Sequence, residues 1–149
     1  MLSTDITVIG AALYFLPVIT RVPLKFGMEI LTEVTCARAR LRVRRRDGRE
    51  AEGWGETPLS VQWVWPSALP YALRQGVLQD FCVRLAKAWP ACGVSGHALE
   101  CGQDFITHTL RAEWSAWNAG RPAAEALPWL AALVCASLFD LAVHDAYGR

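Results

Sequence analysis

The sequence predicts an α+β domain in which a three-stranded antiparallel β-meander is followed by a helical bundle. The first third of the chain is rich in β-branched and aromatic residues or alternates apolar with polar ones, which is typical of strands. An Asp-Gly pair at residues 47–48 interrupts this pattern, as in a tight hairpin. After Pro58 the apolar residues recur every three or four positions, which is the helical period. Strands followed by helices in one chain favour the α+β class.

The strands are expected at about residues 6–16, 31–46 and 50–56. The first should end at Pro17, because proline removes a backbone donor. A loop punctuated by proline and glycine is expected from Pro17 to about Glu29. The second and third strands should pair through Asp47-Gly48, because Asp-Gly readily adopts the positive φ angles of a primed turn. One face of so small a sheet is expected to pack on the helices, since three isolated strands are marginally stable.

Helices are expected at about residues 67–89, 104–118 and 128–147. Ser67 is a suitable N-cap for the first, and Pro90 lies just beyond its expected end. Residues 92–102 contain glycines and are expected to form a loop. Pro128 should open the last helix and Gly148 should cap its C-terminus.

Arginines are concentrated in and after the second strand. They alternate with Ala37, Ala39, Leu41 and Val43, so they should line one face of that strand. The pattern indicates a half-buried antiparallel strand with a solvated face. The formal net charge of +1 gives no reason to expect a nucleic-acid or membrane partner. The arginines concerned are Arg38, Arg40, Arg42, Arg44, Arg45, Arg46 and Arg49.

The cysteines and the apolar segments indicate a soluble, cytoplasmic protein. Five cysteines without paired spacing argue against a disulfide framework and fit a reducing compartment. No metal site is expected, because Cys92, His97 and Cys101 lack the close cysteine pairs of structural zinc sites. The N-terminal apolar stretch lacks the basic segment of a secretory signal. The apolar run at residues 129–143 is too short to span a bilayer and contains Asp140.

Two local patterns resemble functional motifs but have simpler interpretations. Gly53 and Gly55 lack the third glycine of a dinucleotide-binding fingerprint, so we expect them to permit a bend or a close backbone approach. Asp140 and His144 lie one helical turn apart, a spacing at which ion pairs are common. We expect this pair to tether its helix rather than to catalyse a reaction.

Three stretches occur in an order and spacing that are specific only when taken together. They are Arg21-Val22-Pro23-Leu24-Lys25-Phe26-Gly27 after the first strand, Gly53-Trp54-Gly55-Glu56-Thr57-Pro58 at the end of the third, and residues 136–149 in the last helix. They resemble the Pro-Leu loop, the G-x-G-E ending and the A-L-D-x-A-L-W-D-L-x-G-K helix of the enolase-superfamily N-terminal capping domain, of the mandelate racemase and muconate-lactonising type. His144 and Arg149 stand where that family usually has tryptophan and lysine.

The resemblance implies a cap for a catalytic (β/α)-barrel that would begin after residue 149 and is absent from this chain. In such enzymes a magnesium ion on the barrel holds the substrate carboxylate while a lysine or histidine removes the α-proton. The chain is therefore expected to contain no catalytic residue and no metal ligand, and to be inactive alone. Its two lysines, Lys25 and Lys87, cannot supply the family's paired-lysine motif. Racemisation, cycloisomerisation and acid-sugar dehydration all remain open.

Two loops of such a cap close over the barrel mouth and shape specificity. The resemblance therefore implies contacts between a small carboxylate substrate and the two loops that follow the first and third strands. It is assumed here that these strands end together, which brings both loops to the same end of the sheet. The other expected partners are the barrel and further copies in a homo-oligomer. The alternative is a free-standing α+β interaction module that uses Trp54, Trp63 and Trp65 as a recognition surface. The expected substrate contacts are Lys25, Phe26, Met28, Trp54, Thr57 and Leu59.

Overall fold

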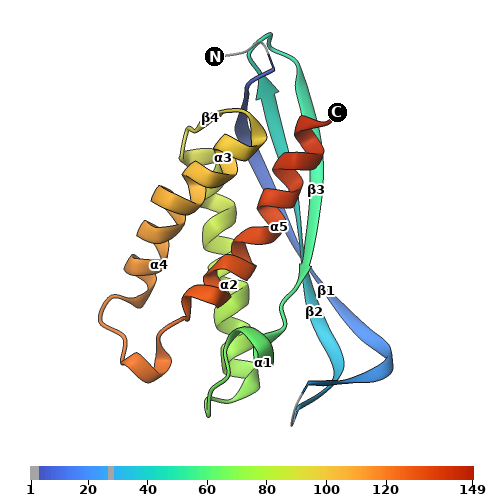
Figure 1. Cartoon of the computed structure of the whole chain (residues 1–149), viewed down its shortest axis with the longest axis vertical. Coiled ribbons are helices and arrows are strands. Elements are labelled where there is room, and N and C mark those ends of the chain that lie inside the picture. The colour runs from blue at the N-terminus through green and yellow to red at the C-terminus, as the bar shows by residue number, and fades with distance from the viewer. Residues whose placement is uncertain (1–3, 27–28) are drawn as a thin grey trace.

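The alternating N-terminal third forms an antiparallel sheet, and the helices pack on one face of it (Figure 1). The computed structural model describes residues 4–26 and 29–149. Strands β1 (Ile6–Phe26), β2 (Glu29–Arg45) and β3 (Glu50–Pro58) form the predicted meander. The two-residue β4 (Ser95–Gly96) pairs with the start of β1, which gives the order β3-β2-β1-β4. The predicted α+β class is confirmed.

The hairpin between β2 and β3 forms where the Asp-Gly pair predicts it. Gly48 has a φ of 89°, in the left-handed region that favours glycine. The Arg45 N–H donates to the Arg49 carbonyl at 2.7 Å and closes the turn. The pairing then runs from Arg44 opposite Glu50 to Cys36 opposite Pro58.

The expected loop at residues 17–29 is wrong for the described residues, because β1 continues through Pro17 to Phe26. Pro17 lies opposite Thr35 within the ladder. At this point β1 pairs only with β2, since β4 reaches no further than Thr7. A proline can occupy an edge strand because the missing N–H would face outward rather than toward a neighbouring strand. Local sequence does not show that this part of β1 is an edge strand, which can accept a proline, so a loop was expected instead.

Two of the three expected helices begin and end close to their expected positions. α2 (Tyr71–Ala91) starts four residues later than expected, after Pro70, and includes Pro90 in its last turn. Ser67 caps only the preceding turn, where its hydroxyl accepts from the Leu69 N–H at 3.2 Å. α5 (Trp129–Tyr147) begins after Pro128 and ends at Gly148, as predicted. The short α1 (Val61–Val64) and the 3-10 turn η2 (Ala123–Glu125) lie in the connections.

The middle helix is longer than expected, and part of the expected loop at residues 92–102 is helical. α3 (Ala98–Asp104), the π-helical η1 (Phe105–Leu110) and α4 (Arg111–Asn118) follow one another without a break. α3 begins with a capping box in which His97 Nδ1 accepts from the Leu99 N–H at 3.1 Å. The Glu100 carboxylate accepts from the His97 N–H at 3.0 Å in return. Histidine is an unusual N-cap residue, so this start carried no familiar signal.

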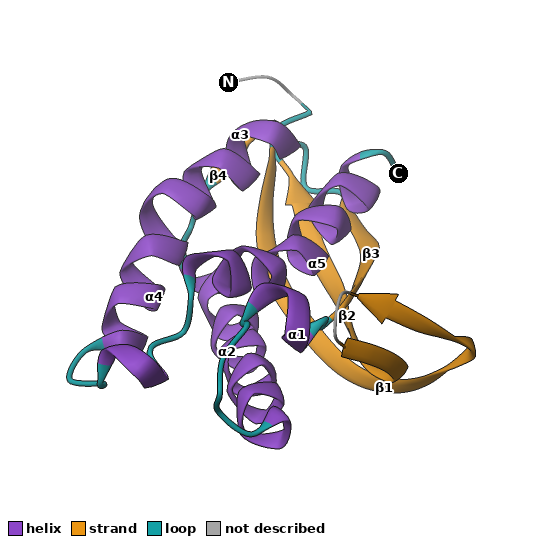
Figure 2. Cartoon of the chain, turned by 60° about the horizontal axis from the view of Figure 1, so that its bottom comes forward, coloured by secondary structure: helices purple, strands orange, loops and turns teal. Residues whose placement is uncertain are grey.

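One apolar core lies between the sheet and the helices. Ala37, Ala39, Leu41 and Val43 are completely buried on the inner face of β2. The arginines that alternate with them are exposed (Arg38, Arg42) or half-buried (Arg40) on the outer face, as the alternation predicts. α2 and α5 cover this inner face (Figure 2). The residues 123–147 form the single described segment that is long and apolar enough to cross a membrane, but half of it is buried within the fold. It is better explained as the core helix of this domain.

Candidate functional site

The middle of β3 lies directly against α5, with no side chain between the two backbones. A Cβ atom built on Gly53 would lie 2.7 Å from the Ala146 Cα and closer still to the Ala142 carbonyl. A Cβ atom on Gly55 would lie 2.7 Å from the Ala142 N and closer still to the Leu138 carbonyl. No side chain fits at such distances, so both positions require glycine. The close backbone approach predicted for this pair is confirmed.

Two side chains of α5 hold β3 in place. The Asp145 carboxylate accepts from the Trp54 N–H at 2.9 Å. That hydrogen bond, followed by the contact with Arg149 at 3.1 Å, holds the pKa of Asp145 below its ordinary value. The Ser137 hydroxyl donates its proton to the Val134 carbonyl. In the 2.8 Å hydrogen bond between Thr57 and Ser137, the Thr57 hydroxyl is therefore the donor and Ser137 Oγ the acceptor. Strand and helix are therefore fixed by polar contacts as well as by packing.

Asp140 and His144 lie on α5 with their side chains about 40% exposed. The distance between Asp140 Oδ2 and His144 Nε2 is 3.9 Å, which is a weak contact rather than a hydrogen bond. Asp140 packs instead against the α3 backbone, where a Cβ atom on Gly102 would overlap its carboxylate. The placement agrees with a structural role for this pair.

The residues expected to touch substrate fall into two separated groups. β3 ends at Pro58, opposite Cys36, whose partner on β1 is Leu16. Lys25 lies nine positions further along β1, about 30 Å away if the strand were straight. The assumption that the first and third strands end together is therefore wrong. We refer to residues 17–26 and 29–35, which extend past β3, as the distal hairpin.

The individual side chains also differ in exposure. Lys25 is exposed on the distal hairpin, and Phe26 is the last residue of β1. Met28 lies outside the described residues. Trp54 is 43% exposed on the outer face of the sheet, whereas Thr57 points inward to α5 and Leu59 is completely buried. Leu59 thus presents no surface to a ligand here, and substrate contact by the others stays a prediction.

A hollow of about 220 Å³ lies where the distal hairpin meets α2. Gln75 Nε2 donates to Thr35 Oγ1 at its floor, and the Thr35 carbonyl accepts from the Leu59 N–H at 2.8 Å. Burial, aided by the nearby Glu33 carboxylate, raises the pKa of the Tyr71 hydroxyl. The hollow brings β1 and β2 of the distal hairpin together with the start of α2, so it is the candidate site at this end of the sheet. Its lining is Pro17, Val18, Ile19, Glu33, Val34, Thr35, Tyr71 and Gln75.

Sequence reasoning missed the polar residues of this hollow. Glu33, Tyr71 and Gln75 belong to no recognisable motif, and Gln75 reaches Thr35 across forty residues of chain. Only the extension of β1 and β2 past β3 creates the hollow. The alternation of apolar and polar residues in β2 extends back to Glu33, and it was the one sequence signal that β2 reaches past the end of β3.

The tryptophans proposed for an interaction module do not share a surface. Trp65 is buried at 3% exposure, and Trp63 is 61% exposed on α1. Trp54 lies on the outer sheet face, where its ring stacks on Tyr14 with 6.0 Å between centroids. The recognition surface expected from these three residues is therefore not formed.

The described residues provide no metal centre. Across residues 4–26 and 29–149, no three His, Cys, Asp or Glu side chains are grouped so that they could hold an ion. The cysteines in this part of the chain are all free. The donor set of a catalytic magnesium site is accordingly not found in this part of the molecule.

The chain is similar to a solved structure but matches no known sequence family. No protein-family model matches the chain, and no curated protein matches it. Among solved structures, the chain is similar to a mandelate racemase/muconate lactonizing protein from Herpetosiphon aurantiacus, with 14% identity and a TM-score of 0.47. The match covers 98% of this chain and 31% of that protein, so the chain spans about a third of its length.

Proposed function

We propose that this chain is the capping and specificity domain of an enzyme of the enolase superfamily, of the mandelate racemase and muconate-lactonising type. The contact between β3 and α5 supports the proposal. Gly53–Pro58 and Ala136–Arg149, the two stretches with the most specific resemblance, are far apart in the sequence but pack backbone to backbone. Gly53, Gly55 and Asp145 thus have a shared physical reason to be present together.

In this proposal the chemistry belongs to a barrel that would follow residue 149. The reaction is α-proton abstraction from a small carboxylate, as in a racemase, a cycloisomerase or an acid-sugar dehydratase. Magnesium bound on the barrel would stabilise the enolate. The described residues of this chain offer no donor set for the ion, so we assign them no chemical step. The chain alone is expected to be inactive, and the intact enzyme to be cytoplasmic and homo-oligomeric.

The role of this chain would be to exclude water and to select the substrate. The distal hairpin projects beyond β3 (Figure 1) and exposes apolar side chains, including Ile19 at 82%, Val22 at 64% and Ile30 at 60%. An apolar projection of this kind can cover the mouth of a barrel. Lys25, at its exposed end, would meet the anionic substrate together with Phe26 and Met28. On the β3 side Trp54 and Thr57 remain candidates, whereas Leu59 would support the loop from within the core.

The test is kinetic and uses the full-length enzyme. Lys25→Ala should change the relative kcat/KM values across a panel of carboxylate substrates about tenfold or more, because it removes a contact that discriminates among them. Lys87→Ala, an exposed lysine on α2, is the matched control and should leave those values unchanged. Unaltered relative kcat/KM in Lys25→Ala would contradict the lid role. A coding sequence without βα repeats after residue 149 would contradict the cap assignment itself.

A further inference from the structure

The outer face of the sheet is left uncovered by the described helices. α2 and α5 pack on the inner face, and no described helix crosses the outer one (Figures 1 and 2). An antiparallel sheet can keep one face in water, so exposure alone does not indicate a partner. The arrangement of charged groups and aromatic rings on this face does indicate a partner.

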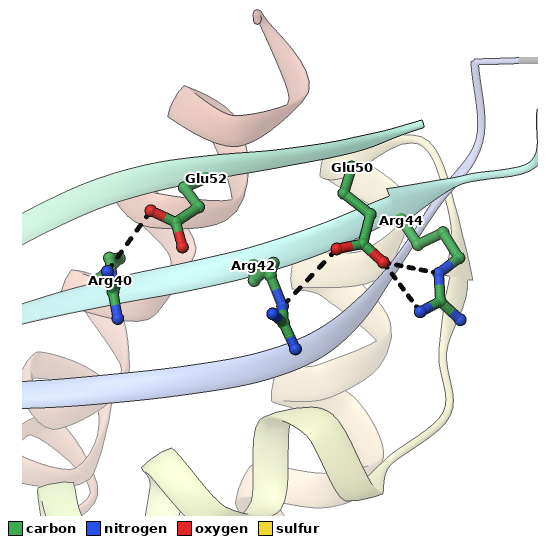
Figure 3. A network of polar contacts seen from close by, with 5 residues as sticks. All are labelled: Arg40, Arg42, Arg44, Glu50 and Glu52. Atoms are coloured by element: carbon green, nitrogen blue, oxygen red, sulfur yellow. Dashed lines mark hydrogen bonds and ion pairs between the residues drawn. The ribbon is translucent and has the colours of Figure 1, made fainter. Parts of the chain in front are cut away.

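Opposite charges form two parallel rows on this face (Figure 3). The basic row is on β2 and the acidic row is on β3, and adjacent members contact one another. Arg44 binds Glu50 at 2.8 Å, Arg40 lies 3.5 Å from Glu52, and Arg42 reaches Glu50 only at 3.8 Å. The cross-strand register is Arg38 opposite Glu56, Arg40 opposite Trp54, Arg42 opposite Glu52 and Arg44 opposite Glu50.

This register is complementary to itself. A two-fold axis that runs parallel to the strands, between β2 and β3, would place a second sheet face to face with the first. Each position on β2 would then lie over the β3 position of its own rung in the other copy. Arg42 would face Glu52 of the second copy, Arg44 would face Glu50, and Arg40 would face Trp54. In such an isologous arrangement, the two-fold axis forms each of these contacts between the two copies twice.

The centre of the face has the features of an interface. Trp54 and Tyr14 are each 43% exposed and stack on one another, and the Arg40 guanidinium lies 5.8 Å from the Trp54 ring. Tryptophan, tyrosine and arginine are the residues most enriched at binding hot spots. A hollow of about 230 Å³ beside them has small residues as its floor, so it can receive part of a facing side chain. It is lined by Gly10, Ala11, Ala12, Arg40, Arg42 and Glu52.

We propose that this outer sheet face is a homodimer interface between two copies of the chain. The inference does not depend on the enolase-like function. Burying ion pairs costs desolvation energy, so the dimer should be weak and sensitive to salt. Raising the salt from about 0.1 M to about 1 M shortens the screening length from about 10 Å to about 3 Å, and should dissociate it.

Two charge variants test the proposal by sedimentation equilibrium. Arg42→Glu/Arg44→Glu makes both rungs acidic, and Glu50→Arg/Glu52→Arg makes them basic. Each variant alone should lose self-association by about tenfold or more in Kd, because like charges would face each other. An equimolar mixture should form a heterodimer, because opposite faces then meet. Mixing the two variants leaves the like-charged pairs within each chain unchanged. Heterodimer formation would therefore show that these residues face each other between the two copies.

Controls keep the test interpretable. Lys87→Glu on α2 changes charge away from this face and should dimerise like the parent chain. If circular dichroism shows that a charge variant is unfolded, Trp54→Ala tests the same surface and should weaken the dimer about tenfold or more. A parent chain that stays monomeric at about 0.1 M salt and about 1 mM protein, a concentration at which even a dimer with a Kd of about 100 µM would form, overturns the proposal. So do variants that dimerise as the parent does, or a mixture that forms no heterodimer.

Discussion

The contact of β3 with α5 and the distal hairpin belong to one sheet but are stabilised differently. At the first, two backbones touch through Gly53 and Gly55, and side chains of α5 bind the strand. In the distal hairpin, β1 and β2 pair mainly with each other, and Thr20 Oγ1 donates to the Thr32 carbonyl at 3.0 Å. A small separate cluster of Leu16, Leu31, Val34 and Cys36 lies at its base.

The difference shows where local sequence is informative. A helix backbone pressed against a strand excludes every side chain, so glycine becomes obligatory and its position is visible in the sequence. A strand that pairs on one side only tolerates proline and exposed apolar residues, which are also the marks of a loop. The glycines at residues 53–55 therefore predicted a close backbone contact correctly. The prolines and apolar residues at 17–26 were compatible with either a loop or an edge strand.

The largest effect is expected at Gly55. Gly55→Ala places a Cβ atom against the backbone of α5 and should lower the free energy of unfolding by at least about 3 kcal/mol, since neither backbone can yield as a side chain would. Gly76→Ala in α2 is the matched control, because a Cβ atom there meets nothing within 4 Å. It should raise stability by about 0.5–1 kcal/mol through helix propensity. Urea unfolding measures both, and effects of the same sign would show that the β3–α5 contact is looser than described.

Truncation of one apolar side chain in each region gives the next largest contrast. Leu138→Ala on α5 removes a completely buried side chain and should cost about 2–5 kcal/mol of unfolding free energy. Ile19→Ala on the distal hairpin removes a side chain that is 82% exposed and should change stability by less than about 0.5 kcal/mol. Urea midpoints that shift equally would mean that the distal hairpin is packed as firmly as the core.

The sequence predicted the features that local rules determine. The alternation in β2, the Asp-Gly turn, the helix after Pro128 and the glycine contact are all found in the structure. The extension of β1 was missed because it depends on a partner strand on the far side of the hairpin. The capping box at His97 was missed because histidine rarely caps helices. The sheet-end hollow combines side chains from three distant segments, so no spacing in the sequence could have revealed it.

A smaller loss than at Gly55 or Leu138 is expected at Asp145, which links α5 to the backbone of β3. The Trp54 N–H, and after it Arg149, favour the ionised carboxylate, so the pKa of Asp145 is lower in the folded chain than in the unfolded one. A lowered pKa means that the stabilisation is complete above the unfolded pKa of about 3.9 and disappears as the pH falls through the folded value. Because the side chain is 37% exposed, Asp145→Ala should cost only about 1 kcal/mol at neutral pH. Asp145→Asn keeps an acceptor for the Trp54 N–H and should cost less. Urea unfolding of the three proteins at several pH values should show the differences shrinking in acid, and a difference that stays constant to low pH would mean that the charge of Asp145 does not hold β3 against α5.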